Sequence, residues 1–394
     1  MKRSKDRVLT THAGSLPRPE DLMTLYRKSA PQSELLPQLK SAVANVAIRQ
    51  ADLGINIIND GEFAKAMPQA ADFAAWWSYI YDRLAGFEVR KEAVDKGRAA
   101  WVQGSRERQE FDEFYAEDAG LGSARTGSSA SRLFGLTCTG PVKYVGQDAV
   151  NRDIDLLRSA ARDTKADEVF MTAVSPATLQ ILANEHYKTQ EDYTWALAEA
   201  ISAEYKAIVD ADFILQIDDP ALVDLWDLWF SARGDTKAYR KWAEFQVEAL
   251  NHALRNIPED RIRYHVCWGS WHGPHTGDVP LKDIADLVIK VNAQAYSLEA
   301  GNVRHEHEWK VWKVTKLPDG KLLIPGVVSH ATNLVEHPEV VADRIIRFAQ
   351  IVGRENVIAG TDCGLGGRVH PQIAWAKLAA LSEGTKLASK ELWK

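Results

Sequence analysis

Two of the three cysteines in this chain lie in short segments whose residue types suit a metal site. His265 and Cys267 stand in the segment YHVCWG, and Cys363 stands in TDCGLG. Glu299 lies between these segments, in YSLEAG. One imidazole, two thiolates and one carboxylate form a tetrahedral donor set that Zn²⁺ accepts. The sequence therefore predicts a zinc site made by these four side chains.

Each segment has the pattern of a short apolar strand that ends in a polar residue followed by glycine. His265 and Cys267 are two residues apart, so both side chains project from the same side of an extended strand. Glu299 closes the next strand and Cys363 closes a later one. Parallel strands that end at one barrel mouth can present four ligands to a single point. The alternative is that His265 packs in the core and the cysteines are inert buried thiols, as we expect of Cys138.

Carboxylates also stand at predicted strand ends. Glu62 ends the segment NDGE, and Asp218 lies in QIDDP after an apolar run. Buried carboxylates are costly unless they are paired or bind a cation, so both are candidates for holding a substrate ammonium or for proton transfer. The alternative is that Asp218 or Asp60 caps a following helix. His330 follows a further strand, in PGVVSH, and is the candidate acid.

Near the N-terminus, residues 11–19 form a turn framed by glycine and proline, THAGSLPRP. Its backbone N–H groups and the Ser15 hydroxyl are suited to bind a carboxylate or another anion. This makes His12, Gly14 and Ser15 candidate substrate contacts. A second His-x-His, in the run RHEHEW at 304–309, offers either a separate metal site or a supporting role beside Glu299.

The elements that must position these side chains alternate between strand-like and helical patterns. Such alternation is typical of parallel β/α units and predicts an α/β fold, a (β/α)8 TIM-type barrel. An open doubly wound sheet is the alternative, but no GxGxxG or Walker-type loop follows an early strand. The predicted strands are 7–15, 55–62, 135–142, 169–176, 213–220, 262–269, 295–301, 322–328 and 357–364. The predicted helices include 35–53, 148–161, 191–211, 238–255, 283–292 and 338–352.

Nine strands are one too many for the barrel. We expect that 135–142 or 169–176 is a side strand, or that the first segment lies outside the ring. Residues 1–394 are predicted to form a single catalytic barrel domain, with an insertion after the second strand at about 67–132. This segment is too long for a single crossover and contains a tryptophan-rich stretch. It is predicted to lie over the barrel mouth or at a subunit contact, and a purely decorative excursion is the alternative.

Composition narrows the class of protein. The chain has 394 residues, 45% of them hydrophobic and 26% charged, as in ordinary globular proteins. A net charge of −6 gives no reason to expect nucleic acid or an anionic membrane as partner, and no apolar run is long enough to span a bilayer. Three cysteines, an odd number, indicate reduced thiols in a cytoplasmic protein. The expected partners are small molecules, and a homo-oligomer is left open.

Together these segments resemble the C-terminal catalytic barrel of cobalamin-independent methionine synthase. The matching motifs are GSxPRP, the GE element, TGPV, QIDDPAL, HVC, the strand ending in Glu299, PGVV and TDCGLG. The resemblance implies a zinc ion held by the residues matching His265, Cys267, Glu299 and Cys363. This zinc binds a thiol substrate as thiolate, and the sulfur takes a methyl group from a folate. The resemblance also places Glu62 and Asp218 at the homocysteine ammonium, and Gly14 and Ser15 at its carboxylate.

This reading predicts a zinc-dependent alkyltransferase that alkylates a small thiol, with homocysteine as the default acceptor. Folate, a methyl-corrinoid and an epoxide remain open as alkyl donor. The last would resemble the epoxyalkane:coenzyme M transferases, and a carbon–sulfur lyase would run the same site in reverse. More remote alternatives are a metal-free barrel similar to uroporphyrinogen decarboxylase and a non-catalytic zinc-binding protein.

Overall fold

The computed structural model describes residues 1–66, 79–90, 105–118 and 136–394. Eight parallel strands form one sheet in the order β1-β11-β10-β9-β8-β7-β5-β2. Between β1 and β2, the backbone N–H of Asn56 donates to the carbonyl of Thr10 (3.1 Å), which brings the two ends of the sheet together. The predicted (β/α)8 barrel is therefore confirmed. Its strands are β1 (Leu9–Thr10), β2 (Ile57–Ile58), β5 (Glu168–Val174), β7 (Ile214–Asp218), β8 (Ile262–Val266), β9 (Ala295–Leu298), β10 (Leu322–Val328) and β11 (Ile358–Thr361).

The ninth predicted strand lies outside the ring. β4 (Leu136–Tyr144) pairs antiparallel with β3 (Leu84–Val89) and parallel with β6 (Ala183–Asn184), forming a separate sheet. A parallel barrel strand is covered on both faces and is buried along its whole length, whereas β4 is mostly half-buried or exposed beyond its third residue. Of the alternatives, 135–142 is thus the side strand.

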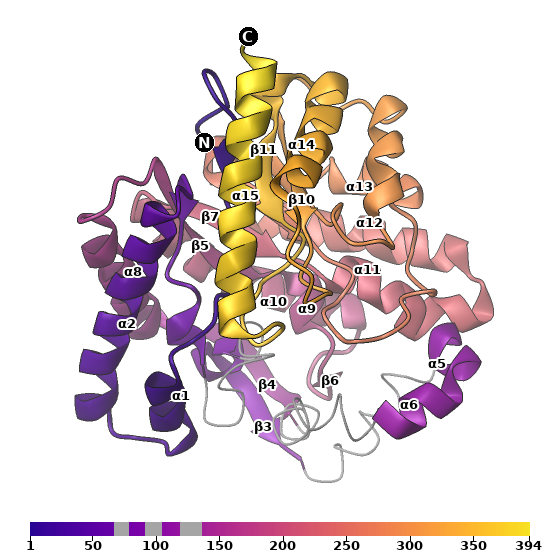
Figure 1. The fold of residues 1–394 in the computed structure, drawn as a ribbon. Helices are drawn as coiled ribbons and strands as arrows, with labels where there is room; N and C mark the ends of the chain where they lie inside the picture. Colours follow the sequence, from indigo (N-terminus) through magenta and orange to yellow (C-terminus); the bar gives the residue numbers. More distant parts are fainter. Residues whose placement is uncertain (67–78, 91–104, 119–135) are drawn as a thin grey trace.

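Helices cover the outside of the barrel, and the long α15 runs along its wall in Figure 1. In the part of the chain that the structure describes, no helix is both long and apolar enough to cross a membrane. The α-helices are α1 (Glu20–Arg27), α2 (Gln32–Asp52), α5 (Arg106–Glu110), α6 (Asp112–Asp118), α8 (Gln147–Ala161), α9 (Pro176–Leu179), α10 (Gln190–Asp210), α11 (Ala221–Leu225), α12 (Thr236–Ala253), α13 (Ala285–Val288), α14 (Pro338–Val352) and α15 (Pro371–Leu392).

The helix predicted at 283–292 is much shorter than expected. Only α13, a four-residue turn, forms there. The hydroxyl of Tyr296 donates to the carbonyls of Ile289 and Val291, both at 3.0 Å. These carbonyls are the acceptors that a longer helix would use, so the strand that follows takes over the end of the connection.

The predicted insertion at 67–132 is described only in part, because 67–78, 91–104 and 119–132 lie outside the described residues. Figure 1 shows the chain termini at one end of the barrel and the side sheet, α5 and α6 at the other. Glu107 of α5 accepts a hydrogen bond from the backbone N–H of Gly277 (3.1 Å) in the long loop after β8. One described piece of the segment therefore lies against a loop at the C-terminal end of a barrel strand.

Inside the barrel, side chains change from apolar to polar along each strand. An apolar cluster fills the interior near the N-terminal ends of the strands. Its members are Leu9, Ile57, Phe170, Ile214, Ala295, Leu322, Ile324 and Ile358. Two residues beyond Ile214 on β7, the same inward face carries Gln216, whose register partner on β8 is Arg263. The next inward pair is Asp218 and His265. Alternate residues on these strands, such as Tyr264, point outward to the helices and join the main core.

Candidate active site

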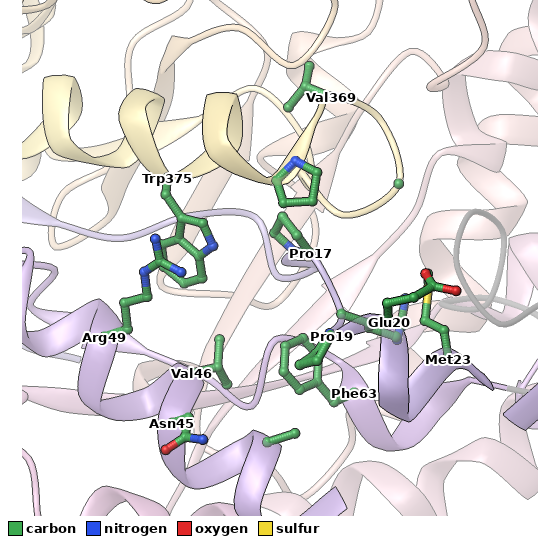
Figure 2. Close-up of a pocket in the computed structure, with 14 residues that line it drawn as sticks. Pro17, Pro19, Glu20, Met23, Asn45, Val46, Arg49, Phe63, Val369 and Trp375 are labelled. Atoms are coloured by element: carbon green, nitrogen blue, oxygen red, sulfur yellow. The ribbon is translucent and has the colours of Figure 1, made fainter. Parts of the chain in front are cut away.

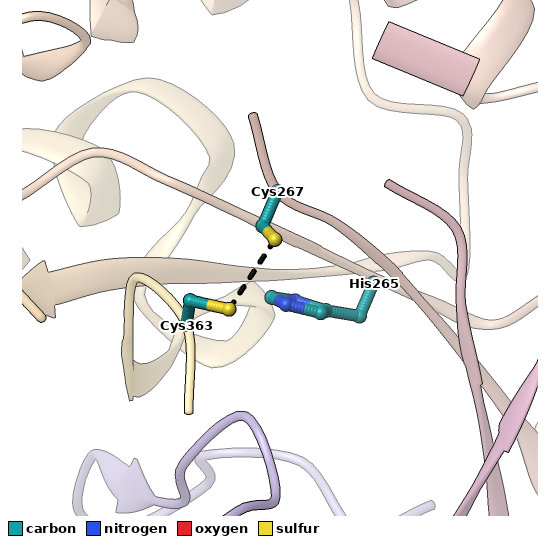
Figure 3. Close-up of side chains that lie close together, drawn as sticks. All are labelled: His265, Cys267 and Cys363. Carbon is teal, nitrogen blue, oxygen red and sulfur yellow. Dashed lines mark hydrogen bonds between the residues drawn. The ribbon is translucent and has the colours of Figure 1, made fainter. Parts of the chain in front are cut away.

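The predicted metal ligands His265, Cys267 and Cys363 meet above the polar layers of the barrel interior. One ligand atom from each of the three lies within 4.8 Å of the others, and the two sulfurs are 3.2 Å apart. Figure 3 shows the imidazole of His265 pointing at the sulfur pair. Its Nδ1 is hydrogen-bonded to the Ser297 hydroxyl (3.0 Å), while buried Nε2 has no hydrogen-bond partner. A proton on Nδ1 leaves the Nε2 lone pair free for a metal, as is usual for ligating histidines.

The two thiols form a coupled pair. The hydrogen bond between the sulfurs lowers the pKa of Cys363 well below its ordinary value and raises that of Cys267 well above it. The pair therefore holds one proton between two sulfur atoms. Burial lowers the pKa of His265, but the Cys363 sulfur beside it outweighs this effect and raises that pKa above its ordinary value. Two sulfurs and an imidazole fit Zn²⁺, whose binding displaces the thiol protons.

Glu299, the predicted fourth ligand, lies beside this trio. It is grouped with His330 and Asp362, with one ligand atom from each within 4.8 Å of the others. Its Oε1 accepts from the backbone N–H of Trp268 (2.9 Å), immediately after Cys267. Burial, helped by the charge of Asp362, raises the pKa of Glu299 well above its ordinary value. The carboxylate is thus fixed against the segment that carries Cys267, and coordination by Glu299 stays a prediction.

His330, the predicted acid, is buried, and its Nδ1 has no hydrogen-bond partner. Burial lowers the pKa of His330 to about 4, against a smaller opposing effect of Cys363. The imidazole is therefore uncharged at neutral pH. It can donate a proton only from its neutral N–H form, and its role as the acid stays a prediction.

Glu62 and Asp218, the two carboxyl groups predicted to bind the substrate, lie together on one side of the trio formed by His265, Cys267 and Cys363. Glu62 is 2% exposed; its Oε1 accepts from the Thr172 hydroxyl (2.8 Å), and its Oε2 has no hydrogen-bond partner. Asp218 is the register partner of His265 on the neighbouring strand. Burial raises the pKa of Asp218 to about 7, and the negative charge of Glu62 adds to this effect. A buried acidic pair with an unpartnered oxygen is suited to a cation.

The turn after β1 closes against Glu62. Gly14 has φ +135°, and a Cβ there would lie 2.5 Å from Oε1 of Glu62, so only glycine fits this approach. The carbonyl of Ser15 accepts from the backbone N–H groups of Leu365 (2.8 Å) and Gly366 (3.1 Å). These residues follow Cys363, so the turn is tied to the loop of the third predicted metal ligand.

His12 has both ring nitrogens engaged within the protein. Its Nε2 is paired with the side-chain carbonyl of Gln50 (2.7 Å), and its Nδ1 accepts from the N–H of Gly14 (3.2 Å). Burial lowers the pKa of His12 to about 3. His12 therefore shapes the turn as a neutral imidazole, and a direct contact with a ligand stays a prediction.

The family model described as the cobalamin-independent synthase catalytic domain matches residues 104–386, well over half of the chain. The chain belongs to this family. Curated relatives of this family member include 2-hydroxypropyl-CoM lyase of Xanthobacter autotrophicus, 26% identical over 92% of this chain and 89% of the relative. A methionine synthase of Saccharolobus solfataricus is 27% identical over 74% of this chain and 79% of the relative.

Among solved structures, the B12-independent methionine synthase from Shewanella sp. W3-18-1 in complex with selenomethionine superposes with a TM-score of 0.66. The two chains are 21% identical, and the match covers 98% of this chain and 99% of that one. The likeness shows that this cobalamin-independent synthase family member shares the fold of that structure over nearly its full length.

In this family member, two residues that the sequence did not single out support Glu299. Asn302 donates from Nδ2 to Oε2 of Glu299 (2.6 Å) and to Oδ2 of Asp362 (3.2 Å). Asp362 in turn accepts from the N–H groups of Ala300 and Gly301, both at 2.8 Å. Asp362 belongs to the TDCGLG motif itself, and Asn302 follows Glu299 by three residues. The closeness of these polar residues in the sequence to the predicted ligands is the signal from which their supporting role could have been predicted.

The second His-x-His run of this family member does not form a separate metal site among the described residues. His305 lies between two carboxylates: Nδ1 is paired with Glu308 (2.9 Å) and Nε2 with Asp278 (3.0 Å). Burial lowers the pKa of His305, but these hydrogen bonds outweigh it and bring the pKa to about 10. The imidazolium also stacks on Trp268, at 4.2 Å between ring centroids. His305 therefore supports the chain segment that follows Cys267.

A cavity of about 560 Å³ lies apart from the predicted site residues, between α2, the turn after β1 and the start of α15 (Figure 2). Its wall is mainly apolar, and the guanidinium of Arg49 lies 3.9 Å above the ring of Trp375 at one side. Arg18 also lines it and donates to the carbonyl of Glu62 (2.7 Å). The cavity thus lies behind the turn that carries Glu62.

Proposed function

We propose that this chain is a zinc-dependent thiol S-alkyltransferase that acts on a small amino thiol of the homocysteine type. His265, Cys267 and Cys363 would hold Zn²⁺, with Glu299 as the fourth ligand. Glu62 and Asp218 would bind the substrate ammonium. The observation that carries the proposal is the adjacency of two incomplete sites: the sulfur–imidazole trio, and the acidic pair that contains the unpartnered Oε2 of Glu62.

Family membership supports thiol chemistry in general, since the relatives include methionine synthases and 2-hydroxypropyl-CoM lyase. When bound, Zn²⁺ would hold a substrate thiol as thiolate at neutral pH. The chain's own residues would supply the orientation. Because Asp218 and His265 are register partners, an ammonium held by Asp218 keeps the substrate one strand away from the metal ligands. The sulfur of a short amino thiol is then directed toward the trio.

Electrostatics favour an amine-bearing thiol over coenzyme M. An ammonium would bring a positive charge to the buried pair of Glu62 and Asp218, whereas a sulfonate at the same place would bring a further negative charge. The turn at Gly14, which is tied to the Cys363 loop through Ser15, would receive the substrate carboxylate. The alkyl donor, whether folate, a methyl-corrinoid or an epoxide, is not distinguished by these residues.

A second candidate function is carbon–sulfur chemistry on coenzyme M. It is favoured by the match to 2-hydroxypropyl-CoM lyase, which spans 92% of this chain. It would require Glu62 and Asp218 to take a cationic partner other than the thiol.

Zinc-edge X-ray absorption of the purified, zinc-loaded protein tests the proposal. We expect the spectrum to gain one sulfur ligand on addition of homocysteine and to be unchanged by coenzyme M. A gain with coenzyme M alone would favour the second candidate. A zinc spectrum indifferent to every thiol would indicate a storage or structural site, and failure of the protein to bind zinc would refute the mechanism.

A further inference from the structure

A buried arginine lies in the barrel interior, directly beneath Glu62 and Asp218, the pair proposed to bind the substrate ammonium. Arg263 is 0% exposed, and its guanidinium lies 3.8 Å above the ring of Phe170. Barrel interiors are usually filled by branched apolar side chains, and a buried cation costs several kcal/mol unless its donors are satisfied. Here the Nε, Nη1 and Nη2 atoms each donate to a different group. The buried guanidinium is therefore satisfied by hydrogen bonds from all three nitrogens.

The first of these hydrogen bonds fixes the orientation of Gln216, the register partner of Arg263 on β7. Nε of Arg263 donates to Oε1 of Gln216 (2.6 Å). An arginine can only donate, so the amide oxygen must face Arg263 and the NH₂ group must face the other way. Gln216 Nε2 accordingly donates to Oδ1 of Asp218 (2.6 Å). Through one amide, the buried cation determines that Asp218 receives a donor.

The same two residues hold the turn after β1. Arg263 donates to the Thr11 hydroxyl (2.8 Å) and to the carbonyl of His12 (2.5 Å). Gln216 donates to the carbonyl of Ala13 (2.5 Å). Three consecutive residues that lead into Gly14 are thus anchored to the polar layer. The turn proposed to bind the substrate carboxylate and the aspartate proposed to bind the substrate ammonium are therefore held by the same two residues.

We propose that Gln216 and Arg263 are positioning residues that determine recognition of the substrate amino group by holding Asp218 and the 11–14 turn in place. This inference rests on the proposed function, in which Asp218 and Glu62 bind an ammonium. In this inference, the specificity for an amino thiol depends on two residues, Gln216 and Arg263, that do not contact the substrate themselves.

The test compares the affinities of zinc-loaded protein for three thiols by calorimetry. These are homocysteine, 4-mercaptobutanoate, which lacks only the amine, and 3-mercaptopropylamine, which lacks only the carboxylate. Gln216→Met keeps the side-chain volume but removes all three hydrogen bonds of Gln216, to Arg263, Asp218 and the carbonyl of Ala13. We expect it to weaken binding of homocysteine and 3-mercaptopropylamine about tenfold, which corresponds to the charge-assisted hydrogen bond to Asp218, and to weaken binding of 4-mercaptobutanoate by a clearly smaller factor, through the turn alone.

Gln246→Met is the matched control. Gln246 is a buried glutamine on α12 whose side-chain amide atoms have no hydrogen-bond partner, so its replacement should alter none of the three affinities. Arg263→Lys is the second variant, because an ammonium carries all its donors on one nitrogen and cannot reproduce the planar fork that reaches three separate acceptors. We expect it to reproduce the loss for the two amines, and it serves if Gln216→Met does not fold.

The outcomes separate the two proposals. If the unmodified protein binds homocysteine no better than 4-mercaptobutanoate, amino-group recognition itself is wrong and the proposed function fails. If the unmodified protein prefers homocysteine and both variants keep that preference, only the positioning proposal fails. A loss of affinity that is equal for all three thiols would mean a general structural role and would also overturn it.

Discussion

The Sγ atoms of Cys267 and Cys363 lie 3.2 Å apart, although 96 residues separate them in the chain. This distance exceeds the bond length of a disulfide by more than an ångström, so the contact joins two thiols that share a proton. β8 ends beside Cys267 and β11 beside Cys363, and β9 and β10 lie between these strands in the sheet. The barrel curvature therefore brings together residues that an open sheet would keep far apart.

Removal of one sulfur should abolish metal binding without unfolding the protein. We expect Cys363→Ala to purify with little zinc, because the site loses a charged ligand, while the large barrel core keeps the fold. Metal analysis and thermal unfolding check this result. Cys138→Ala is the control: Cys138 lies in the side sheet, with its thiol on the carbonyl of Gly140, and should leave zinc content unchanged. Full zinc occupancy in Cys363→Ala would contradict the metal assignment.

The charge of Glu62 should govern the affinity for an amino thiol. Glu62→Gln keeps the shape and the acceptor for Thr172 but removes the negative charge next to Asp218. We expect the dissociation constant for homocysteine to rise about ten- to hundredfold, as for loss of a hydrogen bond between charged groups. Calorimetry with the zinc-loaded variant measures it, and 4-mercaptobutanoate serves as the control ligand. An unchanged homocysteine affinity would point to another acceptor.

Much of the site could be predicted from sequence because strand alternation is local. His265 on β8 and Cys267 just after it had to project from the same side of the chain, and Asp218 had to stand at the end of β7. The barrel followed from counting strand and helix patterns. The choice of side strand did not, since 135–142 has the composition of a strand and only its pairing with β3 and β6 excludes it from the ring.

The supporting groups could not be predicted, because they depend on contacts between distant parts of the chain. Arg263 reads as an ordinary charged residue before a strand end, and its partner Thr11 is 252 positions away. The pairing of His12 with Gln50 on α2 could not be anticipated either, since the two residues lie on different elements. Such partners are fixed by the closed geometry of the barrel rather than by spacing in the sequence.

A buried ion-pair network should stabilise the junction between the side sheet and the barrel. Arg83 pairs with Asp153 of α8 and with Glu204 of α10 (3.0 Å), and all three side chains are buried. Arg83→Met would leave the buried Glu204 without its cation and Asp153 with Arg152 alone, and should lower the free energy of unfolding by about 3–5 kcal/mol. Urea denaturation measures the change. The exposed pair of Arg158 and Asp155 offers the control, because Arg158→Met should cost about 0–1 kcal/mol.

His12 should make the protein less stable in acid. Its pKa is about 3 in the fold and 6.5 in an unfolded chain, so below pH 6.5 the unfolded state takes up a proton that the folded state does not. This contribution lowers the free energy of unfolding by about 1.4 kcal/mol per pH unit between pH 6.5 and 4. His12→Asn should remove that part of the slope, whereas replacement of the exposed His186 should not. Urea midpoints measured from pH 7.5 to 4.5 distinguish the two, and equal slopes would refute a buried neutral His12.

Asn302 should control zinc affinity without contacting the trio. It is the shared donor to Glu299 and Asp362, so Asn302→Ala would leave the second oxygen of each buried carboxyl group without the donor that bridges them. Loss of such a supporting hydrogen bond typically weakens a metal site about ten- to hundredfold. We expect this range for the zinc dissociation constant, measured by competition with a chelator. Asn45→Ala, at an exposed position on α2, provides the comparison. If Asn302→Ala binds zinc as tightly as the parent protein, Glu299 is not a ligand whose orientation matters, and the coordination shell would have to be completed by another group.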